Sequence, residues 1–293
     1  MVDRYGPSKK ITQASTNDTR EALLRRALDA QAAYLPEVRA DIGSQSAEWI
    51  SAQTFFSDQI AIDEFIFFEQ SRYDGVDLKT AGALMMNDYS YIIAAATVPL
   101  FTGFGLIADL SLASVGLRFY TTKKLVDGKI YRARRAHVHF AENLFGYGQL
   151  DNPSDGEWLR SQLEKHFSPV VEQIHARTSL SRAALWRLAG DAIAYLFLDS
   201  GRRFDTAETA KAAAMRILKV HGSPFANREL RYFDLAVADR HHHEKCETFV
   251  QRGGCCRFYH VDGGAYCSTC VLKAPADRDD ELRQAIRNRL ETN

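Results

Sequence analysis

The stretch Cys255-Cys256-Arg257-Phe258-Tyr259-His260-Val261-Asp262-Gly263-Gly264-Ala265-Tyr266-Cys267-Ser268-Thr269-Cys270 holds four of the five cysteines in a chain of 293 residues. Its pattern is C-C-x10-C-x2-C. The spacing of Cys267 and Cys270 lets both sulfurs reach one metal from a turn. Asp262-Gly263-Gly264 is a tight-turn signal, so residues 257–261 and 265–266 are expected to fold back as a hairpin-like loop. The pattern therefore predicts one four-sulfur site.

Three chemistries compete for these sulfurs. Structural zinc accepts all-cysteine sites, but zinc ribbons use two C-x2-C knuckles, and the adjacent Cys255 and Cys256 chelate a single tetrahedral ion poorly. Disulfides are disfavoured because no secretory segment places the chain in an oxidising compartment. A [2Fe–2S] cluster needs four thiolates, and its two irons can divide ligands that one zinc ion could not. The residues favour the cluster and leave zinc and disulfides open.

The motif and its flanks resemble the siderophore-iron reductases of the FhuF type. Residues 249–259 have a basic residue before the Cys-Cys pair and aromatic residues after it, as in that family. Residues 181–186 resemble a helix that continues Trp-Gly-Asn in the family, although Arg187 and Leu188 follow the tryptophan here and Val271 replaces a frequent proline. The resemblance implies a redox-active [2Fe–2S] cluster whose ligands, in both catalytic and metal-binding roles, are Cys255, Cys256, Cys267 and Cys270.

The function that the resemblance implies is a ferric-siderophore reductase, which passes one electron from the cluster to chelated Fe(III) and releases Fe(II) in the cytoplasm. Its partners would be a ferric siderophore or another ferric chelate, and a separate electron-donor protein. A separate donor is expected because the sequence has neither a G-x-G-x-x-G fingerprint after a strand nor a P-loop. Two alternatives stay open: a non-catalytic iron–sulfur redox sensor and a zinc-stabilised siderophore-binding module. No role is assigned to Cys246 or to His241–His243.

Charged and aromatic residues near the motif, and on one predicted strand, are candidates for binding the chelate. Positive charge beside the ligands would raise the cluster potential and could meet chelate oxygens. The alternating rows of residues 129–140 could line a pocket for the chelate, or could be solvated strand faces. The candidate substrate-binding residues are Arg252, Arg257, Arg132, Arg134, Arg135, His137 and Tyr259.

Composition limits the possible partners. Lys+Arg and Asp+Glu are both 37, so no net charge favours nucleic acid or an anionic membrane. The uncharged stretch from Tyr89 to Ala108 is interpreted as a buried helix that ends near Pro99 and is followed by a glycine-containing loop. Membrane association is therefore expected to be peripheral at most. Clustered cysteines without an export signal indicate a reducing, cytoplasmic location.

The periodicity of the chain predicts an α+β fold, predominantly α-helical, with a small antiparallel β-hairpin or sheet and a C-terminal four-cysteine segment. Alternation on both sides of Asp127-Gly128 predicts the hairpin. Residues 1–240 are expected to form a mainly helical body with a ferric-chelate pocket, and residues 241–293 the cluster segment. Residues 1–17 are interpreted as a polar lead-in, and residues 225–245 as a link. Helices are expected at about 18–35, 46–70 (with its phenylalanines in the core), from 77, from 153, from Ser179 or Ser181 to Gly201, at 206–220 and after Pro275.

Overall fold

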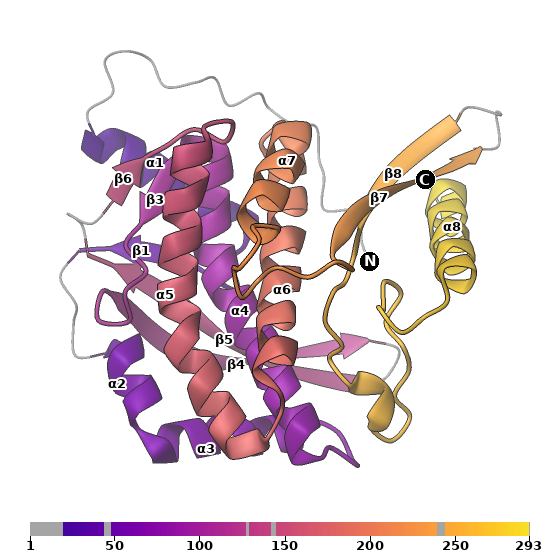
Figure 1. Ribbon diagram of the computed structural model, residues 1–293, viewed down its shortest axis with the longest axis horizontal. Helices are drawn as coiled ribbons and strands as arrows, with labels where there is room; N and C mark the ends of the chain where they lie inside the picture. Colours follow the sequence, from indigo (N-terminus) through magenta and orange to yellow (C-terminus); the bar gives the residue numbers. More distant parts are fainter. Residues whose placement is uncertain (1–19, 44–47, 127–128, 142–144, 239–243, 293) are drawn as a thin grey trace.

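The computed structural model describes residues 20–43, 48–126, 129–141, 145–238 and 244–292 (Figure 1). The polar lead-in, the Asp127-Gly128 turn and His241–His243 lie outside these ranges. Helices make up 55% of the structure and the sheets are small, which confirms the predicted helix-rich α+β class. The helices are α1 (Arg20–Tyr34), α2 (Ala52–Ser57), α3 (Gln59–Gln70), α4 (Leu78–Phe104), α5 (Pro153–Thr178), α6 (Arg182–Arg203), α7 (Ala207–Leu218) and α8 (Pro275–Thr292).

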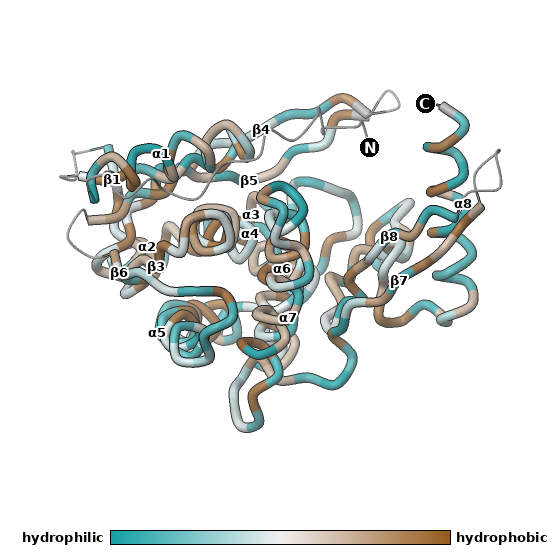
Figure 2. Tube along the Cα trace, turned by 90° about the horizontal axis from the view of Figure 1, so that it is seen from above, coloured by the Kyte–Doolittle hydropathy of each residue, from teal (hydrophilic) through white to brown (hydrophobic). Residues whose placement is uncertain are grey.

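Helix α4 is the central element of the body. Seen from above, β4 (Val115–Val126) and β5 (Lys129–Phe140) lie along one side of it, with α5 and α7 on the other (Figure 2). The helix begins as predicted at Asp77, whose side chain accepts a hydrogen bond from the Thr80 N–H at 2.6 Å. Most of its residues are buried, because neighbouring elements cover it on several sides. In the part of the chain that the structure describes, no helix is both long and apolar enough to cross a membrane.

The predicted end of this helix near Pro99 is wrong, because α4 continues to Phe104. Proline has no N–H, so Pro99 cannot donate to the carbonyl of Ala95, four residues earlier. The side-chain amide of Gln31 donates to that carbonyl instead, at 2.9 Å. Gln31 is fully buried and also bonds the Val38 carbonyl and the Ala40 N–H. A glutamine from α1 thus lets a proline remain inside the buried helix.

The single helix predicted for residues 46–70 is also wrong. The structure has a short strand, β2 (Ile50–Ser51), then α2 and α3, with a break at Asp58. Asp58 is extended, and its carboxylate accepts a hydrogen bond from the Ile60 N–H at 2.9 Å, so it caps α3 instead of continuing α2. The prediction for Phe67 is also wrong: it lies with Ile60 on the outer face of α3 and is 71% exposed, whereas Phe55 and Phe65 are buried as expected.

The predicted hairpin is confirmed. β4 and β5 pair antiparallel from Val115 opposite Phe140 to Val126 opposite Lys129. β1 (Ala40–Ile42) adds to β5 in parallel, and β2 adds to β4, so the sheet order is β1-β5-β4-β2. β3 (Leu106–Ala108) and β6 (Phe145–Tyr147) form a separate pair.

The helices of the second half follow the prediction closely. Ser181, rather than Ser179, caps α6. Gly201 does not end this helix, which runs to Arg203. A Cβ at Gly201 would lie 2.7 Å from the Ala210 side chain, so the glycine instead permits close packing of α7 against α6.

The C-terminal part contains a second hairpin, where a link was expected. β7 (Arg231–Ala238) pairs antiparallel with β8 (Glu244–Gln251) beside α6 (Figure 1). The predicted final helix is present as α8, and its Leu282 and Ile286 pack against Leu235 and Val237 in a small separate core. The division at residue 240 stays a prediction, and β7 and β8 pair across it.

Candidate functional site

The four clustered cysteines lie in the irregular segment that connects β8 to α8. The predicted fold-back is present, but in irregular form: Phe258–His260 is a 3-10 helix, Arg257 before it is left-handed with φ of 60°, and Tyr259 lies against Tyr266. The predicted turn is present: Gly263 has φ of 70°, and the Gly264 N–H donates to the Val261 carbonyl at 2.9 Å. The left-handed Arg257 interrupts any extended run and folds the chain back within a few residues.

The connection between α3 and α4 holds one side of this cysteine segment. The Asp262 N–H donates to the Asp74 carbonyl at 3.0 Å. The Arg257 guanidinium pairs with Asp77 at 2.9 Å, so the residue that caps α4 also anchors the segment. Phe258 packs edge-on against Tyr73, with ring centroids 5.0 Å apart. The cysteine segment is therefore docked against the start of α4.

Helix α6 holds the other side through Asp191, a residue that the sequence reasoning missed. Its carboxylate accepts hydrogen bonds from the N–H groups of Gly253 (2.7 Å) and Gly254 (3.0 Å), and from Arg252 Nε (3.1 Å). A Cβ at Gly254 would lie 2.9 Å from the backbone nitrogen of Leu188, so only glycine allows this approach. The available signal was a carboxylate in the otherwise uncharged stretch 188–198 of α6.

Each of the four sulfurs accepts a hydrogen bond. The Arg257 N–H donates to Cys255 at 3.3 Å, the Phe258 N–H to Cys256, and the Leu272 N–H to Cys270 at 3.5 Å. In these three cases the donor stands two residues after the cysteine. The fourth donor is a side chain: Arg252 Nη1 lies 3.6 Å from the Cys267 sulfur. Such donors stabilise negative charge on sulfur.

The thiols also interact with one another. A hydrogen bond from Cys267 lowers the pKa of Cys256 against the raising effect of burial, and the positive charge of Arg252 lowers it further. The same hydrogen bond raises the pKa of Cys267. Burial raises the pKa of Cys255, opposed by its N–H donor. Cys267 is therefore the hydrogen-bond donor to Cys256, and a metal bound by both sulfurs would displace that proton.

The donor set fits a thiolate-ligated cluster. Four thiols, each with a hydrogen-bond donor, lie on one short segment; Cys270 is buried and the other three are partly exposed. Soft thiolates are the ligand type that iron–sulfur clusters take. Within the described ranges, no three Cys, His, Asp or Glu side chains are grouped so that they could hold a single metal ion.

Three of the predicted substrate-binding residues belong to the cysteine segment itself. Arg252 and Arg257 hold it to α6 and to α4, as described above. Tyr259 packs against Tyr266 with the two rings tilted at 38° and their centroids 4.8 Å apart, and Tyr266 is 47% exposed. The pair therefore presents an aromatic surface beside the cysteines.

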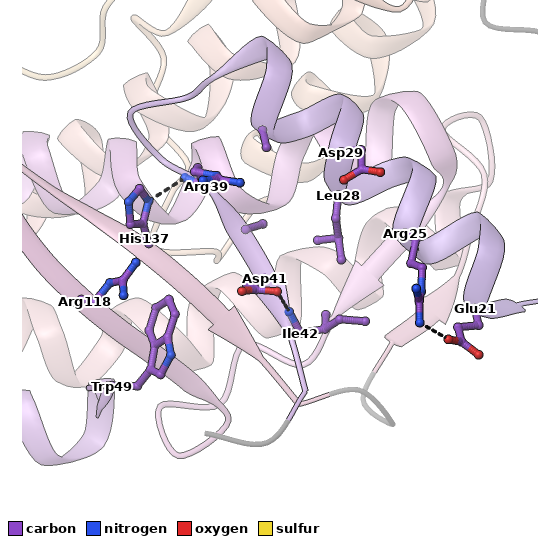
Figure 3. Close-up of a pocket in the computed structure, with 12 residues that line it drawn as sticks. Glu21, Arg25, Leu28, Asp29, Arg39, Asp41, Ile42, Trp49, Arg118 and His137 are labelled. Carbon is purple, nitrogen blue, oxygen red and sulfur yellow. Dashed lines mark hydrogen bonds and ion pairs between the residues drawn. The ribbon is translucent and has the colours of Figure 1, made fainter. Parts of the chain in front are cut away.

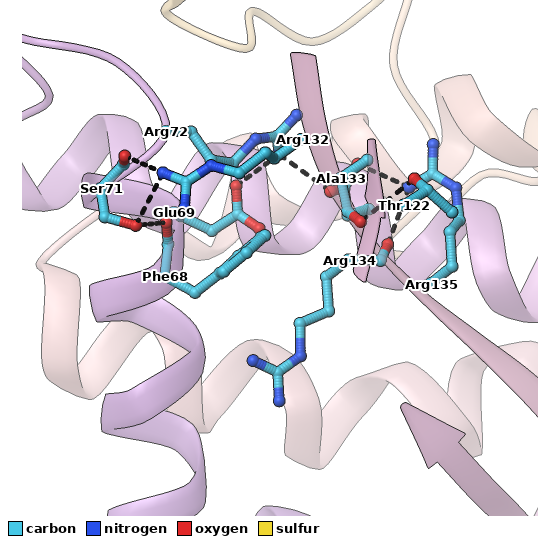
Figure 4. Close-up of polar contacts among 10 residues, drawn as sticks. Phe68, Glu69, Ser71, Arg72, Thr122, Arg132, Ala133, Arg134 and Arg135 are labelled. Carbon is cyan, nitrogen blue, oxygen red and sulfur yellow. Dashed lines mark hydrogen bonds and ion pairs between the residues drawn. The ribbon is translucent and has the colours of Figure 1, made fainter. Parts of the chain in front are cut away.

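The three arginines of β5 contact α3, its connection to α4, or α4 itself, and Figure 4 shows Arg132 beside Ser71 at the end of α3. Arg132 donates to the Ser71 hydroxyl at 3.3 Å, and so reaches the connection on which the cysteine segment is docked. Arg134 stacks over the Phe65 ring at 5.0 Å. Arg135 pairs with Asp88 at 3.2 Å, next to Asn87, which accepts a hydrogen bond from Arg252. The structure thus brings this arginine group close to the supports of the cysteine segment.

His137 belongs to a different surface. It lines a pocket of about 580 Å³ between α1, β1 and the sheet, with Trp49 and Arg118 beside it (Figure 3). Its Nδ1 accepts a hydrogen bond from the Arg39 N–H at 3.3 Å. Burial lowers the pKa of His137, and the charges of Arg118 and Arg39 lower it further. The described residues that line this pocket include no cysteine.

A comparison with protein families identifies the cysteine segment. Residues 252–272 match the model of the FhuF 2Fe-2S C-terminal domain, and the match includes all four clustered cysteines. No curated protein sequence matches the chain. The matched range is the range on which the predicted resemblance was strongest, and the resemblance is confirmed there. The cysteine segment of this chain is therefore similar to the FhuF 2Fe-2S C-terminal domain.

Proposed function

We propose that this protein is a ferric-siderophore reductase, in which a [2Fe–2S] cluster on Cys255, Cys256, Cys267 and Cys270 delivers one electron to chelated Fe(III). The observation that carries the proposal is that each of the four sulfurs accepts a hydrogen bond from an N–H group. The family match over residues 252–272 supports the same cluster.

The chemistry of the substrate explains why one electron is enough. Siderophores bind iron through hard oxygen atoms, which hold Fe(III) far more strongly than Fe(II). When bound, the cluster would supply a one-electron carrier that matches the Fe(III)/Fe(II) couple. One electron supplied in this way would convert the chelated Fe(III) to Fe(II), which the hard oxygen atoms hold more weakly and can release.

The residues around the cysteines have three tasks in this proposal. The N–H donors of residues 257, 258 and 272 stabilise the thiolates. The Tyr259–Tyr266 pair offers a surface on which an apolar chelate can lie. Arg257, and the arginine group of Arg132, Arg134 and Arg135, would attract chelate oxygens; among them Arg132 contacts the connection that supports the cysteine segment.

An electron must also reach the cluster from outside. Three of the four cysteines are partly exposed, so a donor protein can approach within transfer distance. The proposed partners are therefore a one-electron donor protein and a ferric chelate, and the proposed location is the cytoplasm.

The first experiment is anaerobic purification, followed by iron, sulfide and zinc analysis and by electron paramagnetic resonance before and after dithionite. We expect two irons and two sulfides per chain and a one-electron signal on reduction. The reduced protein is then mixed with ferric citrate, a ferric hydroxamate or a ferric catecholate in the presence of a ferrous-specific chromophore. Zinc without sulfide would point to a binding module, and a cluster that reduces none of the chelates would point to a sensor.

A further inference from the structure

Arg252 is held between a carboxylate and a sulfur. Its Nε lies 3.1 Å from Asp191, its Nη1 3.6 Å from the Cys267 sulfur and its Nη2 3.3 Å from Asn87 Oδ1. All three nitrogens of the guanidinium therefore have partners, and the Arg252 side chain is only 16% exposed. A guanidinium group whose three nitrogens all have partners is held in one orientation, and this fixes its positive charge beside Cys267.

Asp191 holds the three residues that directly precede Cys255. One carboxylate oxygen accepts the Gly253 N–H, and the other accepts the Gly254 N–H together with Arg252 Nε. The side chain is 4% exposed. Burial raises the pKa of Asp191 to about 6, against the lowering effects of Arg252 and the two N–H groups, so the carboxylate is ionised at pH 8. It balances the charge of Arg252 in a region that water does not screen.

We propose that Asp191 is a positioning residue that sets the reduction potential of the cluster, by holding Arg252 against Cys267 and by neutralising its charge. The inference rests on the proposed [2Fe–2S] site. Reduction adds one negative charge to the cluster, so nearby positive charge favours the reduced state and nearby negative charge disfavours it. The two partners therefore act with opposite signs on the same potential.

Because the two residues shift the reduction potential in opposite directions, the potential can distinguish this role from a purely structural one. In Asp191→Asn the charge of Arg252 is no longer balanced, and the potential should rise. In Arg252→Gln the carboxylate is left unbalanced and Cys267 loses its charged donor, and the potential should fall. The double variant removes both charges, and its potential should lie between those of the single variants.

The experiment is a potentiometric titration at pH 8, followed by electron paramagnetic resonance, on anaerobic full-length protein with iron and sulfide measured for each variant. Asp199→Asn is the matched control, because it removes a carboxylate from α6 about 12 Å further along the helix axis. Its potential should equal that of the unmodified protein. Single variants that shift in the same direction, or that do not shift, would overturn the inference.

Two outcomes remain separable. If Asp191→Asn takes up no cluster, the comparison of Arg252→Gln with Arg252→Lys decides the question. Lysine keeps the positive charge, so the potential of Arg252→Lys should stay closer to that of the unmodified protein. An unchanged or raised potential in Arg252→Gln would overturn the inference. If the unmodified protein contains no iron and sulfide, the proposed function itself fails, and that result is read before any variant is compared.

Discussion

The side-chain amide of Gln31 on α1 donates to the carbonyl of Ala95 on α4, the group that Pro99 leaves without its helical N–H. We expect Gln31→Leu to lower the free energy of unfolding by about 2 kcal/mol or more, because it leaves buried backbone groups without partners. Urea unfolding measures the loss. Pro99→Ala restores the missing N–H to Ala95, so the double variant should recover part of it. An equal loss in the single and double variants would show that Gln31 acts elsewhere.

The four clustered cysteines differ from the fifth in the proposed role. Serine at Cys267 or Cys270 should nearly abolish bound iron and sulfide, because a hydroxyl is a poor replacement for a thiolate. Cys246 is exposed on β8, outside the motif, so Cys246→Ser should retain both. Metal analysis decides the matter, and a full complement of iron in Cys267→Ser would exclude this residue as a ligand.

Gly254 permits the close contact between the cysteine segment and α6. Gly254→Ala should cost about 1–3 kcal/mol and reduce cluster content, since its Cβ would stand 2.9 Å from the Leu188 nitrogen. Gly156→Ala is the control, because its Cβ would meet Ile217 at an ordinary 3.5 Å and alanine favours a helix. Unfolding and iron analysis compare the two. If Gly254→Ala behaves like Gly156→Ala, the approach to α6 is not tight.

His166 predicts how stability depends on pH. It is fully buried, bonded to the Tyr89 hydroxyl and the Leu110 carbonyl, each at 2.7 Å. Burial lowers its pKa to about 4, from 6.5 in the unfolded chain. The unfolded state therefore binds the proton more strongly, and stability should fall by up to about 1.4 kcal/mol per pH unit as the pH drops from about 6.5 toward 4.

The comparison variant is His166→Gln, which cannot take up a proton. Its unfolding free energy, measured in urea at several values between pH 7 and pH 5, should change less than that of the unmodified protein. Parallel pH profiles would mean that other groups cause the loss.

Arg132 tests the proposed substrate surface. Arg132→Gln should raise the concentration of ferric chelate needed for half-maximal reduction severalfold, with the cluster content unchanged. Its cross-strand partner Lys123 is the matched control, since it is an exposed cation in register on β4. Steady-state reduction of the ferric chelate by Arg132→Gln and by Lys123→Gln measures the two half-maximal concentrations. An equal rise in both variants would indicate a general effect of charge rather than a contact with the chelate.

Local patterns in the sequence predicted local structure well. The β4–β5 hairpin follows from alternation around Asp127-Gly128. The cysteine segment, which the family comparison matches, was found from the spacing of its cysteines. The β7–β8 hairpin was missed although Phe233, Leu235 and Val237 alternate along β7, because β8 is mostly polar and the helix on which these residues pack, α8, comes some 40 residues later in the chain. The break at Asp58 was missed because an aspartate can cap a helix or lie within one.

Distant partners were beyond prediction for a different reason. Asp191 lies 61 residues before Arg252, and nothing in the spacing of either residue indicates their pairing. The continuation of α4 past Pro99 likewise depends on Gln31, on a separate helix. Both contacts depend on tertiary packing, which periodicity does not encode.

The cysteine segment begins at the end of β8 and ends at the start of α8, and these two elements belong to the same small core. The helical body has its own core, in which α4 and α6 take part. Loss of iron to oxygen or to a chelator would therefore leave both cores folded and both ends of the segment in place. A molecule that had lost its iron would then keep the four cysteines between two fixed ends, where they could receive a new cluster.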